Sequence, residues 1–184
     1  MSESADILQK RKTLQEAMNF TAALAYGIEQ IVGLGAHGMA FIAGKKLGTE
    51  FAAHAKKTAD PAEALEEVRR ILLENDCNWD FVVFQPRGGA EELLEVKTGE
   101  ENILLVFRDC MIRESLFRFG HKQKGSLCRI MYGFFSGAIE SIMGKKVQLE
   151  ILHAGANACL KRLRIKMDTV QIDRTVKAGK ILSQ

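Results

Sequence analysis

The spacing of apolar residues changes near residue 77, and this change restricts the fold more than any other feature of the chain. Before it, apolar residues recur at helical spacing over three segments, 5–31, 36–56 and 61–73. After it, alternation predicts strands at 79–84, 92–96, 102–107, 146–153 and 159–167. A further helix is predicted over 127–143, with Ser126 as its N-cap and Gly144 at its end. Helices packed on an antiparallel sheet, with a late helix leading into a C-terminal β-hairpin, indicate an α+β fold.

Length and composition fit one globular domain. The chain has 184 residues, of which 47% are hydrophobic and 27% charged, which is ordinary for a protein with a single core. We expect one domain over 1–167 and a tail or short helix over 168–184. The acidic start and the absence of a long apolar run predict a cytoplasmic protein without a membrane span. The net charge of +3 is mild and no helix-turn-helix is evident, so direct nucleic-acid binding is not expected.

The predicted C-terminal hairpin gathers reactive side chains on its core face. Strict alternation puts His153 on the core face of the first strand and Cys159 on that of the second, both at the turn end. Lys161 is the exception on the otherwise apolar face of the second strand. Cys128 lies in the first turn of the preceding helix, where the helix dipole stabilises a thiolate.

Two sulfur atoms and one imidazole form a donor set that suits zinc. Glu150 is a candidate fourth ligand, but a regular strand would point it to the opposite face, so a bulge or an early strand end near Leu152 is required. One alternative is that the cysteines are ordinary core residues and the histidine an ordinary turn residue. Another is a redox switch in which Cys128, as a thiol of low pKa, exchanges disulfides with Cys110 and Cys159.

The segment 126–167 carries several spaced residues that agree with one known pattern. These are Cys128, the helix glycines Gly133 and Gly137, the Gly-Lys-x-Val element at 144–147, then Glu150, His153 and Cys159. In this order they resemble the 4-vinyl reductase domain, also called the hydrocarbon-binding domain. The sequence departs from the family in having histidine at 153, where cysteine is usual, and in a shorter turn before the final cysteine. More weakly, Gly33, Gly44, Gly48 and the Asp109-Cys110 pair also resemble that domain.

The resemblance implies both a site and a function. It implies zinc held by Cys128, Glu150, His153 and Cys159, beside a cavity for a small hydrophobic molecule. The family shares its fold with haem-based nitric-oxide sensors and vesicle-tethering subunits, and its members bind small hydrophobic molecules, often as sensory modules. A binding module with a sensory or carrier role, forming a homodimer, is therefore expected. A role as accessory protein or reductase in tetrapyrrole metabolism is the alternative, although no general acid or hydride-cofactor site is visible.

Aromatic residues supply the candidates for the walls of such a cavity. They are Trp79, Phe81, Phe107 and Phe134, for which plain core packing is the alternative. His37, near a helix start, is a further candidate pocket residue, with a capping or packing role as the alternative and no haem assigned to it. The segment 109–125 is predicted to be an irregular loop that could bring Arg113 or Arg118 to an anionic ligand.

Overall fold

The computed structural model describes residues 3–75, 77, 79–84, 100–118 and 123–166. The helices among them are α1 (Glu3–Val32), α2 (Gly35–Phe51), α3 (Pro61–Glu74), α4 (Met111–Arg118) and α5 (Ser126–Met143). The strands are β1 (Trp79–Val83), β2 (Glu100–Cys110), β3 (Val147–Ala154) and β4 (Cys159–Lys166). This order confirms the predicted α+β class. The predicted strand at 92–96 and the tail at 168–184 lie outside the described residues.

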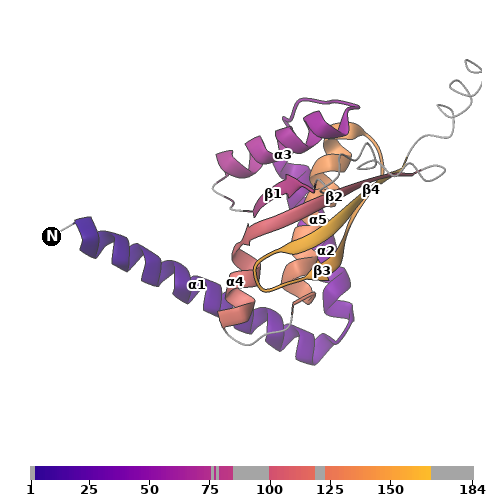
Figure 1. The fold of residues 1–184 in the computed structure, drawn as a ribbon. Helices are drawn as coiled ribbons and strands as arrows, with labels where there is room; N and C mark the ends of the chain where they lie inside the picture. Colours follow the sequence, from indigo (N-terminus) through magenta and orange to yellow (C-terminus); the bar gives the residue numbers. More distant parts are fainter. Residues whose placement is uncertain (1–2, 76, 78, 85–99, 119–122, 167–184) are drawn as a thin grey trace, which may run out of the picture.

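The four described strands form one antiparallel sheet in the order β1-β2-β4-β3. The C-terminal hairpin therefore joins the earlier strands through β4, whose Cys159 and Leu163 lie opposite Phe107 and Ile103 of β2. Helix α5 covers the apolar face of this sheet, and α2 packs on the far side of α5 (Figure 1). The core lies between the sheet, α3 and α5.

Helices α2 and α5 approach each other closely because glycines line the contact. Gly44 and Gly48 of α2 lie against the backbone of Ile130 and Phe134, and a Cβ atom at either glycine would collide with the facing carbonyl oxygen. Gly133 and Gly137 of α5 meet the backbone of α2 in the same way. Pairs of glycines four residues apart occupy one face of a helix, so the two pairs create a matched seam. The absence of side chains at these four positions therefore allows the two helices to pack closely.

Helix α3 begins where the sequence predicts it. The Asp60 carboxylate accepts hydrogen bonds from the backbone N–H groups of Ala62 at 2.7 Å and Glu63 at 3.4 Å, which makes it the N-cap ahead of Pro61. One face of the helix, formed by Ala64, Leu65, Val68, Ile71 and Leu72, is buried.

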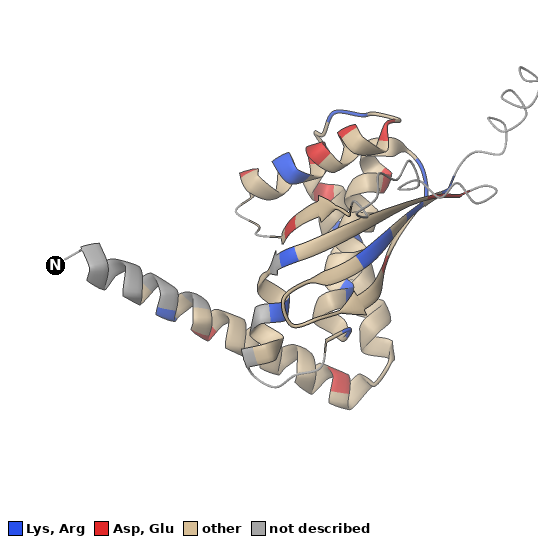
Figure 2. Cartoon of the chain, viewed as in Figure 1, with Lys and Arg blue, Asp and Glu red and all other residues tan. Residues whose placement is uncertain are grey.

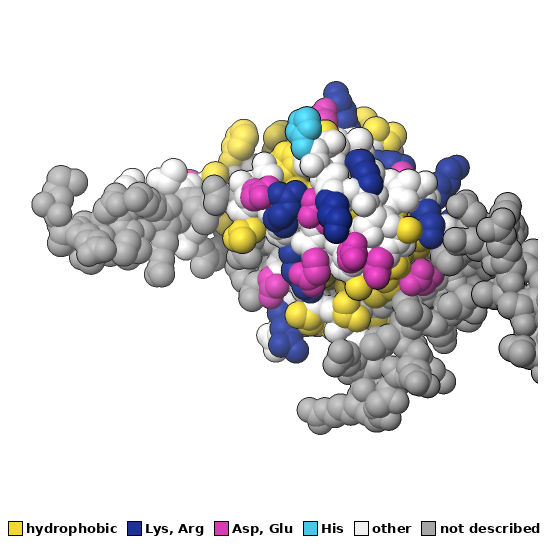
Figure 3. Space-filling view, turned by 90° about the horizontal axis from the view of Figure 1, so that it is seen from above, with side chains coloured by type: hydrophobic (Ala, Val, Ile, Leu, Met, Phe, Trp, Pro, Cys, Tyr) yellow, Lys and Arg dark blue, Asp and Glu magenta, His cyan; other side chains and the backbone are white. Residues whose placement is uncertain are grey.

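Figure 3, viewed from the α3 side, shows acidic and basic side chains intermixed rather than gathered by sign.

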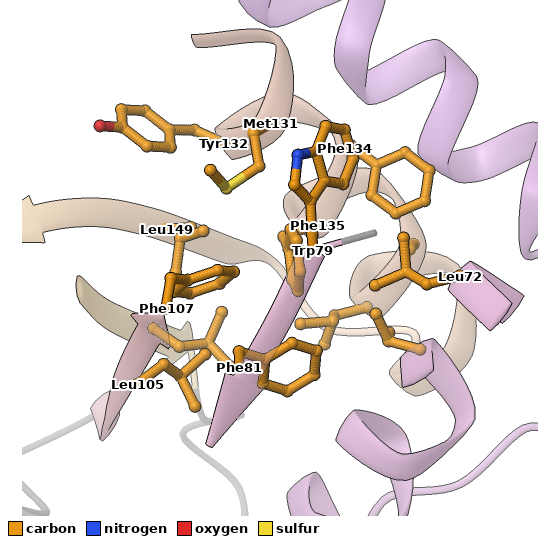
Figure 4. Packing of buried hydrophobic residues seen from close by; sticks show 14 of the residues in the cluster. Leu72, Trp79, Phe81, Leu105, Phe107, Met131, Tyr132, Phe134, Phe135 and Leu149 are labelled. Atoms are coloured by element: carbon orange, nitrogen blue, oxygen red, sulfur yellow. The ribbon is translucent and has the colours of Figure 1, made fainter. Parts of the chain in front are cut away.

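Aromatic rings fill the centre of the core. Phe134 and Phe135 of α5 lie beside Trp79 of β1, with the ring centroids of Trp79 and Phe134 5.2 Å apart (Figure 4). Phe135 also makes edge contacts with Phe81 and Phe107, at centroid distances of 5.3 and 5.2 Å. Offset and edge contacts of this kind stabilise aromatic clusters beyond their buried area.

The segment expected to be an irregular loop is partly helical. Residues 111–118 form α4, because Ile112 and Leu116 lie one turn apart and are both buried. Strand β2 is also longer than predicted and runs directly into this helix. Gly125 rather than Ser126 is the N-cap of α5, and Ser126 is its first residue.

Helix α1 extends away from the body toward the N-terminus (Figure 1). From residue 17 to residue 34 the only charged side chain is Glu29, and Figure 2 shows correspondingly little charge on this half of the helix. Large apolar side chains nevertheless remain exposed there, among them Phe20, Leu24, Ile28 and Ile31. No described helix is both long and apolar enough to cross a membrane.

Candidate ligand-binding site

The prediction of zinc is wrong. Within the part of the chain that the structure describes, no three side chains of His, Cys, Asp or Glu are grouped so that they could hold a metal ion. Cys128 and Cys159 are both buried in the core, at 8% and 5% exposure, but His153 is exposed. The expected donor set is thus divided between the two faces of the sheet.

A β-bulge explains why His153 lies on the outer face. Up to Ile151, which pairs with Lys161, strand β3 follows regular alternation. The register then shifts, and His153 pairs with Leu160 while Ala154 pairs with Cys159. The extra residue reverses the alternation, so Ala154 takes the core-side place that a regular strand would give to the histidine.

Glu150 also lies on the outer face. Its carboxylate is 2.9 Å from the guanidinium of Arg164 and 3.6 Å from that of Arg162. The bulge follows Glu150 along the strand and therefore does not turn it toward the core. The carboxylate joins a cross-strand ion-pair network on the exposed side of the hairpin.

The core face instead holds a buried lysine. Lys161 lies between Cys159 and Leu163 along β4 and is only 2% exposed. Its Nζ atom is 4.0 Å from the centroid of the Phe107 ring, 5.1 Å from that of Tyr132 and 2.8 Å from the sulfur of Met131. Burial lowers the pKa of Lys161 to about 8. In the sequence, Lys161 is a charged residue on an otherwise apolar strand face. This exception is the sequence feature from which the site could have been found.

Further polar groups without hydrogen-bond partners lie near this end of α5. The Tyr132 hydroxyl and the Ser126 hydroxyl are both buried, and neither has a partner among the described residues. Burial also raises the pKa of Tyr132, so its phenol stays protonated. Buried polar groups are nearly always hydrogen-bonded in folded proteins, and each exception needs an explanation such as an ordered water, an ion or a bound molecule.

Three cysteines surround the lysine without forming disulfides. Cys110, Cys128 and Cys159 are free and buried, and each acts electrostatically on Lys161. Burial raises the pKa of Cys128, which outweighs its position at the helix start, so this thiol is not the low-pKa group that the redox hypothesis expects. Buried thiols without thiolate character are poor redox sensors.

A cavity of about 620 Å³ opens beside this cluster. It lies between the C-terminal half of α1, the start of α2, α4 and the start of α5. Its lining includes Ala22, Ala25, Tyr26, His37, Leu116 and Leu127. His37, a predicted pocket residue, therefore does line a cavity, although not one formed by the predicted aromatic residues.

Two residues join the cavity to the buried cluster. Gln123 lines the cavity, and its Oε1 atom accepts a hydrogen bond from the Cys159 thiol at 3.7 Å. Ser126 lines it as well, two residues before Cys128 on α5. At the cavity wall the Glu29 carboxylate accepts a hydrogen bond from the backbone N–H of Ser126, which places a negative charge at the N-terminus of α5.

The predicted aromatic pocket residues lie in the core. Trp79, Phe81 and Phe134 pack against other rings, as the alternative reading of the sequence expected, while Phe107 also faces Lys161. Arg113 of α4 is buried and donates hydrogen bonds to the backbone carbonyls of Phe107 and Arg108. The side chain of Arg118 lies outside the described part of the structure.

Comparison with known proteins identifies one informative likeness. No protein-family model matches the chain, and a search of curated proteins finds no match. Among solved structures, the phenol-responsive sensory domain of the transcription activator PoxR, determined with phenol, is similar with a TM-score of 0.58. The match covers 81% of this chain and 74% of that chain at 13% sequence identity. The likeness is one of fold. At this identity it assigns neither a ligand nor a role to individual residues.

Proposed function

We propose that this protein is a sensory or carrier domain that binds a small aromatic molecule. The observation that carries the proposal is a pair of buried polar side chains, Lys161 and Tyr132, beside Phe107 and Met131. The Tyr132 hydroxyl has no hydrogen-bond partner among the described residues, and the Lys161 ammonium contacts only the sulfur of Met131 among them. Apolar walls with a few converging polar groups are the usual composition of small-molecule sites. The similar fold of a phenol-responsive sensory domain supports this class of ligand.

The site we propose extends from the cavity beside α1 to the lysine behind it. The cavity supplies apolar surface from Ala22, Ala25 and Leu127, and its volume of about 620 Å³ is ample for one aromatic ring with substituents. Gln123 stands between the cavity and Cys159, so a molecule that displaces this amide would reach the polar cluster. Its ring would then lie in the cavity, with its polar group toward Lys161 and Tyr132.

Filling the cavity tests the proposal. Ala25 is half-buried and lines the cavity, whereas Ala23 is exposed on the same helix and does not line it. Isothermal titration with phenol, benzyl alcohol, benzamide and benzoate should detect binding by the wild-type protein. Ala25→Trp should weaken that binding at least about tenfold by occupying the ligand's space, and the matched Ala23→Trp variant should not. Absence of binding by every compound, or equal binding by both variants, would refute the proposed site.

We also propose that α1 pairs with α1 of a second copy. Phe20, Leu24, Ile28 and Ile31 follow helical spacing on one side of α1, and their exposed fractions run from 39% to 86%. Ala22, Ala25 and Glu29 occupy the opposite side, against the cavity. An uncharged apolar stripe on a projecting helix fits an identical stripe in a symmetric dimer, and monomers rarely expose such patches.

Light scattering at increasing protein concentration tests the dimer. Wild-type protein should have twice the mass of one chain, and Ile31→Glu should shift it to the monomer because a carboxylate would be buried in an apolar contact. Asn19→Glu changes an exposed residue outside the stripe and should leave the mass unchanged. A monomeric wild type, or a dimeric Ile31→Glu protein, would contradict this pairing.

A further inference from the structure

The lysine behind the cavity has no carboxylate partner among the described residues. No described carboxylate lies within ion-pair distance of Lys161, and within the described part of the chain its hydrogen-bond contact is the sulfur of Met131. An ammonium group transferred into a protein interior loses several kcal/mol of hydration unless a counter-charge replaces it. The faces of Phe107 and Tyr132 replace part of that hydration through cation–π contacts, but they bring no negative charge.

Among the described residues, the groups that face Lys161 from the surrounding elements are thiols, a phenol and a guanidinium, with no carboxylate among them. β2 contributes Cys110, α4 contributes Arg113, α5 contributes Cys128 and Tyr132, and β4 contributes Cys159. Burial raises the pKa of the Cys128 thiol and of the Tyr132 phenol, so both stay protonated. Arg113 adds a second buried positive charge and opposes protonation of the lysine. The region is therefore electropositive and enclosed.

Geometry adds a hydrogen-bond donor to this charge. The Tyr132 hydroxyl is buried and has no partner among the described residues, and its ring centroid is 5.1 Å from the lysine nitrogen. An ammonium group and a phenol O–H both donate hydrogen bonds, so a ligand that binds to both must supply an acceptor. The acceptor best suited to both is an anionic oxygen, because charge-assisted hydrogen bonds are the strongest kind.

We infer that the ligand is a small aromatic anion, whose carboxylate or phenolate oxygen pairs with Lys161 and accepts a hydrogen bond from Tyr132. This inference rests on the proposed function and adds the charge of the ligand to it. The aromatic part of the anion contacts the cavity walls, while the negative oxygen supplies the counter-charge that the Lys161 ammonium lacks among the described residues. Neutral aromatic compounds of the same shape leave the ammonium unpaired and bind less tightly.

Benzoate and benzamide are matched probes because they have nearly the same shape and differ in charge. Isothermal titration at pH 7 should show benzoate binding to the wild type roughly tenfold or more tightly than benzamide, the ratio that a charged hydrogen bond provides. Lys161→Met should abolish this preference by weakening benzoate binding. Lys166→Met removes an exposed lysine of the same strand and should leave the preference intact. Circular dichroism on the same samples verifies that each variant is folded.

The outcomes separate this inference from the proposed function. Equal affinity for benzoate and benzamide in the wild type, or a preference that persists in Lys161→Met, overturns the anion and leaves aromatic binding standing. Failure of both probes and of phenol to bind overturns both proposals. The affinity of the wild type for benzoate should also fall as the pH rises above about 8, where the Lys161 ammonium of the free protein loses its proton. Lys161→Met should show no such decline.

Discussion

Replacing Lys161 with methionine should make the unliganded protein more stable. Burial lowers the pKa of Lys161 from the ordinary value of 10.5 to about 8. That difference corresponds to about 3 kcal/mol of folding free energy lost by keeping the ammonium form in the core at neutral pH. The cation–π contacts with Phe107 and Tyr132 return about 1 kcal/mol. Methionine has similar length and no charge, so Lys161→Met should gain about 2 kcal/mol at pH 7.

The pH dependence of this gain has a definite direction. Between pH 8 and 10.5 the unfolded chain holds the lysine proton and the folded protein has released it, so wild-type stability rises with pH across this window relative to the variant. The advantage of Lys161→Met should therefore be full below pH 8 and shrink toward pH 10.5. Other groups of the protein also titrate in this pH window. Because they are common to both proteins, the difference between the two isolates the lysine.

Urea unfolding of the wild type and of Lys161→Met, followed by circular dichroism, measures the difference in their stability at pH 7 and at pH 10.5. Lys166→Met is the control, since that lysine is exposed, and its stability should stay within about 0.5 kcal/mol of the wild type at both pH values. A Lys161→Met protein less stable than the wild type at pH 7, or an advantage unchanged at pH 10.5, would refute the claim that a charged lysine is buried without a counter-ion.

Three further substitutions test the fold and the corrected site by the same unfolding measurements. Gly44→Ala should lower the free energy of unfolding by at least about 2 kcal/mol, because the new methyl group meets the backbone of Ile130. Gly38→Ala is the control: this glycine has open space around it, so the change should be neutral or stabilising by up to about 1 kcal/mol. Equal effects of the two substitutions would contradict the close helix contact. Asp60→Ala should cost about 1 kcal/mol by removing the cap of α3, and no loss would mean that this cap is not used in solution. His153→Ala should change stability by less than about 0.5 kcal/mol, since the imidazole is exposed; a loss of several kcal/mol would show that the histidine has a structural role after all.

The fold class was predictable because it depends on periods that extend over many residues. Helical spacing in the first part of the chain and alternation after it stay recognisable even when single residues depart from the pattern. The N-cap at Asp60 is recognisable from neighbouring residues alone, without knowledge of distant contacts. The short helix α4 was not predicted because the helical pattern there consists of a single apolar turn, from Ile112 to Leu116, among basic and aromatic residues.

The site was harder to predict because it depends on single residues whose partners are distant in the sequence. One extra residue in β3 reverses the alternation, and no sequence signal announces the bulge, so His153 was placed on the wrong face. Lys161 was visible as an exception, but its burial follows from the way α5 lies across the sheet. The cavity beside α1 depends on how α1, α4 and α5 meet, which local patterns do not encode.

The glycine seam between α2 and α5 has a consequence for the order in which the protein folds. During synthesis α1, α2 and α3 leave the ribosome well before α5. Until α5 follows, Gly44 and Gly48 lack their contact with the α5 backbone at Ile130 and Phe134. Contacts between segments so far apart slow folding, because a long loop must close before they form. A nascent chain that ends before Ser126 should therefore remain sensitive to protease, and protection should begin only when α5 has emerged and seated between α2 and the sheet.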